Sequence, residues 1–270
     1  MRKYIKIGFI GTGNMGGALA TAVANVGYRS VLFDKDTDKS AALSEKIGGK
    51  VVNSLTALLD NCTFVFIGVK PQMLEDLAAE MRPMLDERGE SAPLLISMVA
   101  GTSIARLEEL FGKRFIIRIM PNTPVRVGKG MTLWCASENV FEPQIETFLD
   151  MMSLSGKVDM IDEKLIDAAS AVSGCGPAFV YMFIEALADG GVLCGLPRDK
   201  AITYAAQTLA GASAYLMESG EHPGKLKDNV CSPGGTTIEG VRALEANGFR
   251  SAATEAVIAA YEKTLTLEKK

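Results

Sequence analysis

Apolar and polar positions follow a strand–helix rhythm over residues 1–162. Short apolar runs alternate with stretches whose apolar positions recur at helical spacing, which predicts strands separated by helices. The run at 63–69 is almost continuously apolar, as in a central parallel strand covered on both faces. This part of the chain therefore belongs to the α/β class. We predict strands at residues 4–10, 28–33, 50–52, 63–69, 94–98, 115–120, 131–136 and 157–161, and helices at 14–26, 54–60, 71–84, 103–111 and 142–154.

The rhythm changes after Asp162, where no further strand pattern occurs. Residues 163–270 read as long helices rich in Ala, Leu, Ile and Met, interrupted by glycines and prolines. We therefore expect two domains, an α/β domain at 1–162 and an all-α domain at 163–270. Helices with apolar surface on more than one face need partners, and the small residues at 201–214 suit close helix packing between subunits. An oligomer is favoured over a monomer.

Composition and charge exclude several classes of protein. With 48% hydrophobic and 22% charged residues in 270, the chain has ample core for two domains. The net charge of −4, without a basic cluster, gives no reason to expect nucleic acid. We found no apolar run of the ~20 residues that a membrane span needs, and we expect no signal or transit peptide. The five cysteines are scattered, which favours a reducing, cytoplasmic location and neither a disulfide framework nor a metal site.

A glycine-rich loop joins the first predicted strand to the first predicted helix. Its G-x-G-x-x-G spacing lets backbone approach a pyrophosphate, while the free N–H groups of the helix N-terminus face the anion. The alternative is a glycine-rich turn without a ligand; position and context favour a dinucleotide site. The candidate cofactor-binding residues here are Gly11, Thr12, Gly13, Asn14, Met15 and Gly16.

Asp34 ends the second predicted strand, about 20 residues beyond the glycine loop, where such folds hydrogen-bond the adenosine ribose. Its carboxylate argues for NADH because it repels a 2′-phosphate. Lys35, and Lys39 a turn further on, are cations that reverse this preference if they face the ribose. The alternative is a solvated turn. The cofactor is therefore NADPH or NADH.

Three further loops leave the carboxyl ends of strands, the edge that holds the ligand crevice in an open α/β sheet. Turn chemistry alone also explains prolines, glycines and asparagines at such places. The candidates to line the nicotinamide half of the cofactor are Val69, Lys70, Pro71, Ala100, Asn122 and Thr123.

Two features of the sequence restrict the class of substrate. A dehydrogenase acting on an alcohol needs a group that moves the hydroxyl proton, but the single histidine, His222, lies in a predicted turn. β-Hydroxyacid dehydrogenases resemble this chain at 173–176 and carry a catalytic lysine on the following helix; here no lysine occurs before Lys200. An imine suits the chain better, because its nitrogen can arrive already protonated.

The second feature is the segment Ser232-Pro-Gly-Gly-Thr-Thr237, a tight turn that opens a helix ending near Asn247. Its free N–H groups, glycines and hydroxyls would hold a small carboxylate much as the first loop holds a pyrophosphate. The alternative is an N-cap after a turn.

Five motifs together resemble the pyrroline-5-carboxylate reductase family: GFIGTGNMG at 8–16, VKP at 69–71, MPNTP at 120–124, SGCGPA at 173–178 and DNVCSPGGTT at 228–237. The resemblance implies reduction of 1-pyrroline-5-carboxylate to L-proline by NADPH or NADH. It also implies a Rossmann-type dinucleotide-binding domain followed by an all-α domain that interlocks in a homodimer, often assembled into larger rings.

The resemblance also assigns roles to residues. The glycine loop, Val69 to Pro71 and Asn122 would hold the cofactor. Thr237 would hydrogen-bond the ring nitrogen or the carboxylate; both remain open. Asp34 departs from the small, polar or basic residues of NADPH-preferring members. Two alternatives remain, another imine or hydroxy-acid reductase of this architecture and a non-enzymatic NAD(P)-binding regulator. The residues expected to bind the substrate carboxylate are Ser232, Gly234, Gly235, Thr236 and Thr237.

Overall fold

The computed structural model describes residues 2–267 and divides the chain into two compact units. The first comprises Met1–Gly174 together with Ala260–Lys270, and the second is Cys175–Ala259. The domain boundary expected at Asp162 stays a prediction, because the division into units follows spatial contacts and returns the end of the chain to the first unit. Residues 1 and 268–270 of the expected domains lie outside the described residues.

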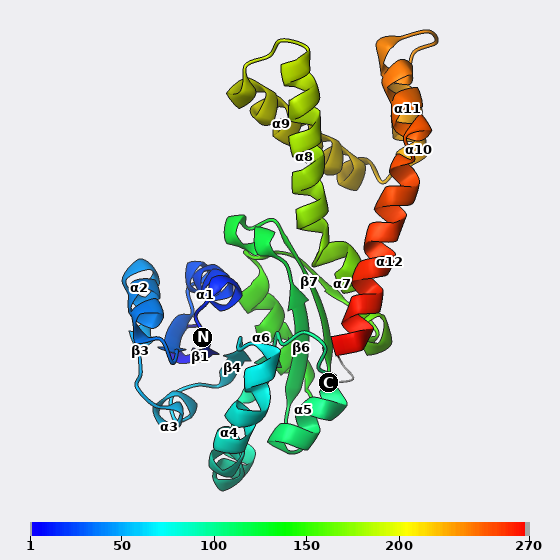
Figure 1. The fold of residues 1–270 in the computed structure, drawn as a ribbon. Coiled ribbons are helices and arrows are strands. Elements are labelled where there is room, and N and C mark those ends of the chain that lie inside the picture. The colour runs from blue at the N-terminus through cyan, green and yellow to red at the C-terminus, as the bar shows by residue number, and fades with distance from the viewer. Residues whose placement is uncertain (1, 268–270) are drawn as a thin grey trace. The chain divides into compact units, whose positions relative to one another are not determined.

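The first unit is built on one eight-stranded sheet with the order β3-β2-β1-β4-β5-β6-β7-β8 (Figure 1). All neighbouring strands are parallel except β6 and β7, which pair antiparallel. Each predicted strand is present, and the α/β expectation is confirmed. The strands are β1 (Lys6–Ile10), β2 (Arg29–Phe33), β3 (Lys50–Val51), β4 (Phe64–Ile67), β5 (Leu94–Ser97), β6 (Ile116–Pro121), β7 (Gly130–Ala136) and β8 (Gly156–Met160).

Strand β1 occupies the place where the chain changes direction across the sheet. From β1 the chain moves outward through β2 and β3, then returns to pair β4 against the other side of β1. In an open parallel sheet, this switch point leaves a crevice outside the carboxyl ends of the strands. The fold therefore places the glycine loop after β1 and the loop after β4 at a ligand-binding edge.

Helices cover both faces of this sheet, and each face has its own core. One core includes Leu19 and Phe148, from helices on one face, and the other includes Leu58 and Met81, from helices on the opposite face. The helices of this unit are α1 (Asn14–Val26), α2 (Thr37–Ile47), α3 (Leu55–Leu59), α4 (Leu74–Arg88), α5 (Ile104–Phe111), α6 (Glu142–Met152) and α7 (Ile166–Ser173), with short 3-10 turns η1 (Arg2–Tyr4), η2 (Pro71–Met73), η3 (Gly89–Ser91), η4 (Thr123–Val127) and η5 (Glu163–Leu165).

Two helices differ from the sequence-based expectation. The helix expected to end at Met84 continues to Arg88, although Pro83 lies inside it. Pro83 is exposed, while Met81 and Leu85 on either side are buried, so the core contacts hold the helix together across one missing hydrogen bond. Helix α2 was not predicted. Its sequence is mostly polar, and its apolar stripe is too narrow to stand out from a loop.

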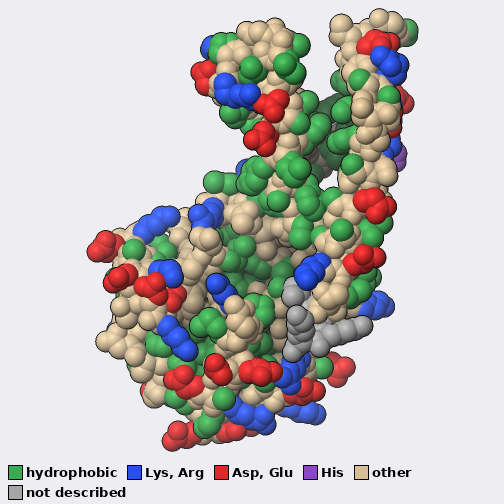
Figure 2. Space-filling model, viewed as in Figure 1, with side chains coloured by type: hydrophobic (Ala, Val, Ile, Leu, Met, Phe, Trp, Pro, Cys, Tyr) green, Lys and Arg blue, Asp and Glu red, His purple; other side chains and the backbone are tan. Residues whose placement is uncertain are grey.

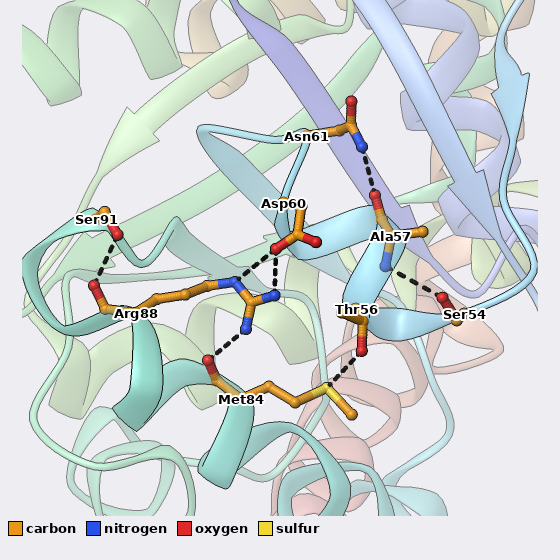
Figure 3. A network of polar contacts seen from close by, with 8 residues as sticks. All are labelled: Ser54, Thr56, Ala57, Asp60, Asn61, Met84, Arg88 and Ser91. Carbon is orange, nitrogen blue, oxygen red and sulfur yellow. Dashed lines mark hydrogen bonds and ion pairs between the residues drawn. The ribbon is translucent and has the colours of Figure 1, made fainter.

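Near the amino ends of β4 and β5, away from the ligand-binding edge, polar side chains connect α3 to α4 (Figure 3). The Arg88 guanidinium donates from Nε to Asp60 at 3.1 Å, and its Nη1 donates to the carbonyl of Met84. Ser54 caps α3 by accepting from the N–H of Ala57 at 3.1 Å. These contacts stabilise the packing of α3 against α4 and involve none of the loops at the ligand-binding edge.

The second unit is entirely helical, as expected, and its helices break at the predicted glycines and prolines. Helices α8 and α9 pack together, and Phe183 of α8 lies against Phe249 at the start of α12, with ring centroids 5.4 Å apart. The helices are α8 (Gly176–Leu193), α9 (Arg198–Ser219), α10 (Pro223–Asn229), α11 (Thr236–Ala246) and α12 (Phe249–Leu267), the last of which ends in the first unit.

Much apolar surface of these helices is exposed, and green side chains are numerous on α8 and α9 in Figure 2. Tyr181, Met182 and Leu193 are 61, 70 and 90% exposed. Contrary to the sequence-based expectation, one helical stretch, Glu163–Leu193, is long and apolar enough to cross a membrane by length and composition alone. It is divided into η5, α7 and α8, and glycines interrupt it at the break between α7 and α8.

Candidate cofactor and substrate sites

The glycine loop is shaped by backbone crowding at two of its three glycines. Gly11 has a φ of +88°, and a Cβ there would lie 2.6 Å from the carbonyl oxygen of Gly68, at the end of β4. A Cβ on Gly16 would lie 2.0 Å from the carbonyl oxygen of Gly11. Only glycine satisfies both positions without moving the backbone. Gly11 therefore makes the turn beside β4, and Gly16 lets α1 pack onto it.

Gly13 is different, because the protein itself gives no reason for a glycine there. Its φ of −67° suits any residue, and a Cβ on it would meet nothing within 4 Å. It is the N-cap of α1, and no side chain caps the free N–H groups of that helix. Space for a close approach beside free N–H donors fits a dinucleotide pyrophosphate. Asn14 is exposed and Met15 half-buried at the first turn of α1.

Asp34 lies at the end of β2, and its carboxylate faces the glycine loop. One oxygen, Oδ2, accepts from the N–H of Thr12 at 2.6 Å and from its hydroxyl at 2.9 Å. The other oxygen, Oδ1, accepts from the N–H of Asp36 at 3.0 Å. Both oxygens therefore hold the loops around the site. Lys35, beside Asp34, is exposed.

A cavity of about 520 Å³ adjoins the N-terminus of α1 and lies between α1, α2 and η4. Three cations line it, Lys39, Lys46 and Arg126, and no acidic side chain does. Lys39 pairs with Asp36 at 2.8 Å. The hydrogen bond between them lowers the pKa of the Asp36 carboxyl and raises the pKa of the Lys39 amine. Both groups therefore stay charged at neutral pH, and the cavity keeps a positive surplus.

The loop after β4 comes next to the glycine loop, as predicted. The N–H of Gly68 donates to the carbonyl of Ile10 at 2.8 Å, which ties the two strand ends together. Val69 is half-buried against the core, whereas Lys70 and Pro71 are exposed where η2 begins. These positions are compatible with the predicted nicotinamide contacts, which stay predictions.

Asn122, at the end of β6, is buried, and both ends of its amide are engaged by the backbone. Its Nδ2 donates to the carbonyl of Ser173 at 2.8 Å, and its Oδ1 accepts from the N–H of Met131 at 2.9 Å. The side chain therefore joins β6 to β7 and to the last residue of α7. A contact between this side chain and a cofactor would use the remaining Nδ2 hydrogen or the second lone pair of Oδ1.

Arg118, on the same face of β6, anchors the start of the same helix. It is 1% exposed, and its guanidinium binds Asp167 of α7 at 3.0 Å and Glu163 at 3.2 Å. Glu163 also accepts from the N–H of Ile104, which begins α5, at 2.6 Å. Arg118 and Asn122 thus fix both ends of α7 to the sheet. Sequence reasoning assigned no role to Arg118, and nothing in its local pattern marks it as an ion-pair centre.

The second predicted site lies in the helical unit, at residues 232–237. The N–H of Gly235 donates to the carbonyl of Ser232 at 3.0 Å, closing the predicted turn, and Gly234 has a φ of +68°. Gly235 is the N-cap of α11, again without a side-chain cap, so its N–H donors are free. Ser232, Thr236 and Thr237 are exposed around this N-terminus. The segment has the donors that a carboxylate needs.

His222 has the local role that its position suggested. Its Nδ1 accepts from the N–H of Gly224 at 3.1 Å and caps α10. Among residues 2–267, no three His, Cys, Asp or Glu side chains gather as a metal site.

Sequence reasoning missed Arg126, which lines the cavity from η4. Its Nη2 donates to Oδ1 of Asn14 at 2.8 Å and to the carbonyl of the same residue at 3.3 Å. The available signal was a cation four residues beyond Asn122, in a loop that leaves the ligand-binding edge. The pattern gives no means of telling which neighbouring loop this side chain reaches.

Two protein-family models match the chain. The model described as pyrroline-5-carboxylate reductase dimerisation covers residues 163–267. The model described as NADP oxidoreductase, coenzyme F420-dependent, covers residues 6–101.

Full-length relatives are found among characterised proteins and solved structures. The chain is 39% identical to pyrroline-5-carboxylate reductase from Pisum sativum over 97% of this chain and 95% of that protein. It is also 39% identical to the protein of the same name from Escherichia coli, over 98% of both chains. The crystal structure of Plasmodium falciparum pyrroline carboxylate reductase with NADP bound superposes with a TM-score of 0.86 at 36% identity, covering 98% of this chain and 99% of that one.

Proposed function

The chain belongs to the pyrroline-5-carboxylate reductase family, and on that premise we propose that it reduces 1-pyrroline-5-carboxylate to L-proline with NADPH or NADH. The observation that carries this proposal is the full-length match, which spans the cofactor loop and residues 232–237 together. A regulator that only sensed the cofactor would have no use for a second loop with free N–H donors and hydroxyls. A hydroxy-acid reductase would need a proton-moving group, which neither loop contains.

The residues around the glycine loop fit the cofactor. Gly13 leaves open the space that a pyrophosphate needs, and the N–H groups of α1 supply donors and the positive end of a helix dipole. Asp34 keeps the Thr12 backbone in place beside them. When bound, the cofactor supplies a hydride for the C=N carbon of the substrate. The assignments of Val69, Lys70, Pro71 and Asn122 to the nicotinamide half are part of this proposal.

The segment 232–237 binds the substrate carboxylate in this proposal. The N–H groups at the start of α11 and the hydroxyls of Ser232, Thr236 and Thr237 supply donors, and Gly234 and Gly235 admit the anion close to the backbone. The ring nitrogen enters protonated, so hydride addition at carbon yields the amine without a protein acid. Thr237 orients the substrate through its hydroxyl, directed at the ring nitrogen or at the carboxylate.

The chain forms homo-oligomers, since its helical part matches a dimerisation family over residues 163–267. In our proposal, this interface covers the exposed apolar surface of α8, which forms the second half of the apolar stretch Glu163–Leu193. In our proposal, dimers assemble into a larger homo-oligomer, and the enzyme works in the cytoplasm without membrane or nucleic-acid partners.

The decisive experiment measures oxidation of NADPH and NADH by absorbance, with 1-pyrroline-5-carboxylate as substrate and proline identified as product. The proposal expects turnover that depends on both the imine acid and the enzyme. A panel of keto acids and acyclic imines, the oxidised substrates that the alternative reductases would consume, serves as the matched comparison. The proposal would be refuted if the enzyme reduced a panel member but not the cyclic imine. It would also be refuted if the enzyme bound the cofactor and reduced no substrate.

A further inference from the structure

The cavity between α1, α2 and η4 adjoins the glycine loop, because Thr12, Gly13 and Asn14 line it. We propose that Arg126, assisted by Lys39, binds the 2′-phosphate of NADPH in this cavity and makes the chain prefer NADPH in spite of Asp34. The inference rests on the proposed function only in taking a nicotinamide dinucleotide as the ligand.

The cavity carries a positive charge. Every ionisable side chain that lines the cavity is a cation, and the three come from two different elements, α2 and η4. Lys39 is partly neutralised by Asp36 at 2.8 Å. Within residues 2–267, Arg126 has no carboxylate partner and donates only to Asn14. An arginine held by neutral groups keeps its full charge and its remaining N–H donors for a phosphate. Figure 2 shows Lys and Arg side chains near the ends of α1 and α2.

The carboxylate oxygens of Asp34 are engaged by the neighbouring loops. A carboxylate that selects NADH has to present its oxygens to the ribose hydroxyls. Here Oδ2 accepts two hydrogen bonds from Thr12, and Oδ1 accepts one from the N–H of Asp36. Asp34 does not line the cavity. Three donors therefore already compensate its charge, and its repulsion of a phosphate in the neighbouring cavity is reduced.

The cavity also lies beside the expected pyrophosphate site. Thr12, Gly13 and Asn14 form one wall of the cavity, so it is continuous with the space that Gly13 leaves open for the pyrophosphate. One dinucleotide can therefore place its pyrophosphate at Gly13 and its 2′-phosphate in the cavity. The hydrogen bonds from Arg126 to Asn14 hold the guanidinium at this wall. A volume of about 520 Å³ is ample for the phosphorylated ribose.

The test measures cofactor binding to the full-length oligomer without imine substrate, by the fluorescence of NADPH and NADH. Arg126→Met should raise the Kd of NADPH about tenfold, the loss of one charge-assisted contact at a partly exposed site, and change that of NADH less than about twofold. Lys129→Met removes a cation from the same segment outside the cavity and should change neither. Arg126→Lys should recover part of the NADPH affinity.

A second arm uses fragments. Adenosine 2′,5′-bisphosphate should displace NADPH from the unaltered protein better than AMP does, and Arg126→Met should abolish the difference. Equal weakening of NADPH and NADH would assign Arg126 to the pyrophosphate and overturn the proposal, as would no change in either. Because no imine is used, a chain that binds NADPH through Arg126 and reduces no imine would refute the proposed function while supporting this inference.

Discussion

The carboxylate of Asp34 accepts hydrogen bonds from both the backbone N–H and the hydroxyl of Thr12, at 2.6 and 2.9 Å. This pair joins the end of β2 to the glycine loop across 22 positions of sequence. From the sequence, Asp34 was expected either to contact the adenosine ribose or to lie in a solvated turn. In the structure it also shapes the loop on which the pyrophosphate would rest, so a change at this residue affects both loop and ligand.

Replacing Asp34 by Asn removes the charge while the amide oxygen still accepts from Thr12, and only the hydrogen bond from the N–H of Asp36 is lost. We expect Asp34→Asn to raise the affinity for NADPH relative to NADH about fivefold, as removal of roughly 1 kcal/mol of repulsion would do. Asp34→Ser should move the ratio in the same direction but weaken both cofactors, because Thr12 loses its acceptor. Fluorescence titration of both variants measures the ratio. An unchanged ratio in both would mean that the Asp34 charge has no influence at the ribose.

Two of the loop glycines, Gly13 and Gly16, should respond differently to alanine. Gly16→Ala places a methyl group 2.0 Å from the carbonyl of Gly11 and should destabilise the first unit, seen as a lower Tm. Gly13→Ala meets no protein atom, so its free energy of unfolding should change by less than about 1 kcal/mol. Cofactor affinity should nevertheless fall at least about tenfold in Gly13→Ala, because the methyl group occupies the open space. Full affinity in that variant would contradict a pyrophosphate at Gly13.

A substitution at Thr237 tests whether residues 232–237 bind the substrate separately from the cofactor. Thr237→Ala should lower kcat/KM for 1-pyrroline-5-carboxylate about tenfold, since one hydrogen bond to a charged substrate is lost. The Kd of NADPH should remain unchanged. Thr147→Ala is the matched control, because its hydroxyl donates to the carbonyl of Pro143 in its own helix, outside the segment 201–214. Equal losses in imine turnover and NADPH affinity would refute the assignment of separate sites.

A substitution at Arg118 tests how much its ion pairs with Glu163 and Asp167 contribute to stability. Arg118→Met leaves the carboxylates of Glu163 and Asp167 without their buried partner and should cost about 3–5 kcal/mol of stability. Adding Glu163→Gln and Asp167→Asn should recover part of this loss, because no unpaired charge remains. Urea unfolding followed by the fluorescence of Trp134, the single and buried tryptophan, measures the effect. The exposed Arg29→Met should change stability by less than about 0.5 kcal/mol, and a similar result for Arg118→Met would show that the ion pairs contribute little.

The sequence by itself determined the elements whose signals are local. Helix α1 begins at Asn14 and ends at Val26 as predicted, because an apolar stripe and Gly27, with a φ of +104°, mark it within one short stretch. The turn at residues 232–235 and the start of α11 at Thr236 were predicted for the same reason. Helix α2 was missed because its few apolar residues leave no such stripe.

Only the tertiary structure decided which side chains meet across the sheet. Asn122 turned out to bind the backbones of Met131 and Ser173, and Arg126 reached Asn14 across 112 positions. These contacts depend on the strand order, which brings loops after β1, β2 and β6 to one edge, and on hydrogen-bond partners that no periodicity encodes. Local spacing specifies a helix or a turn; the partner of a buried amide or an exposed guanidinium is set by whichever backbone the fold carries to it.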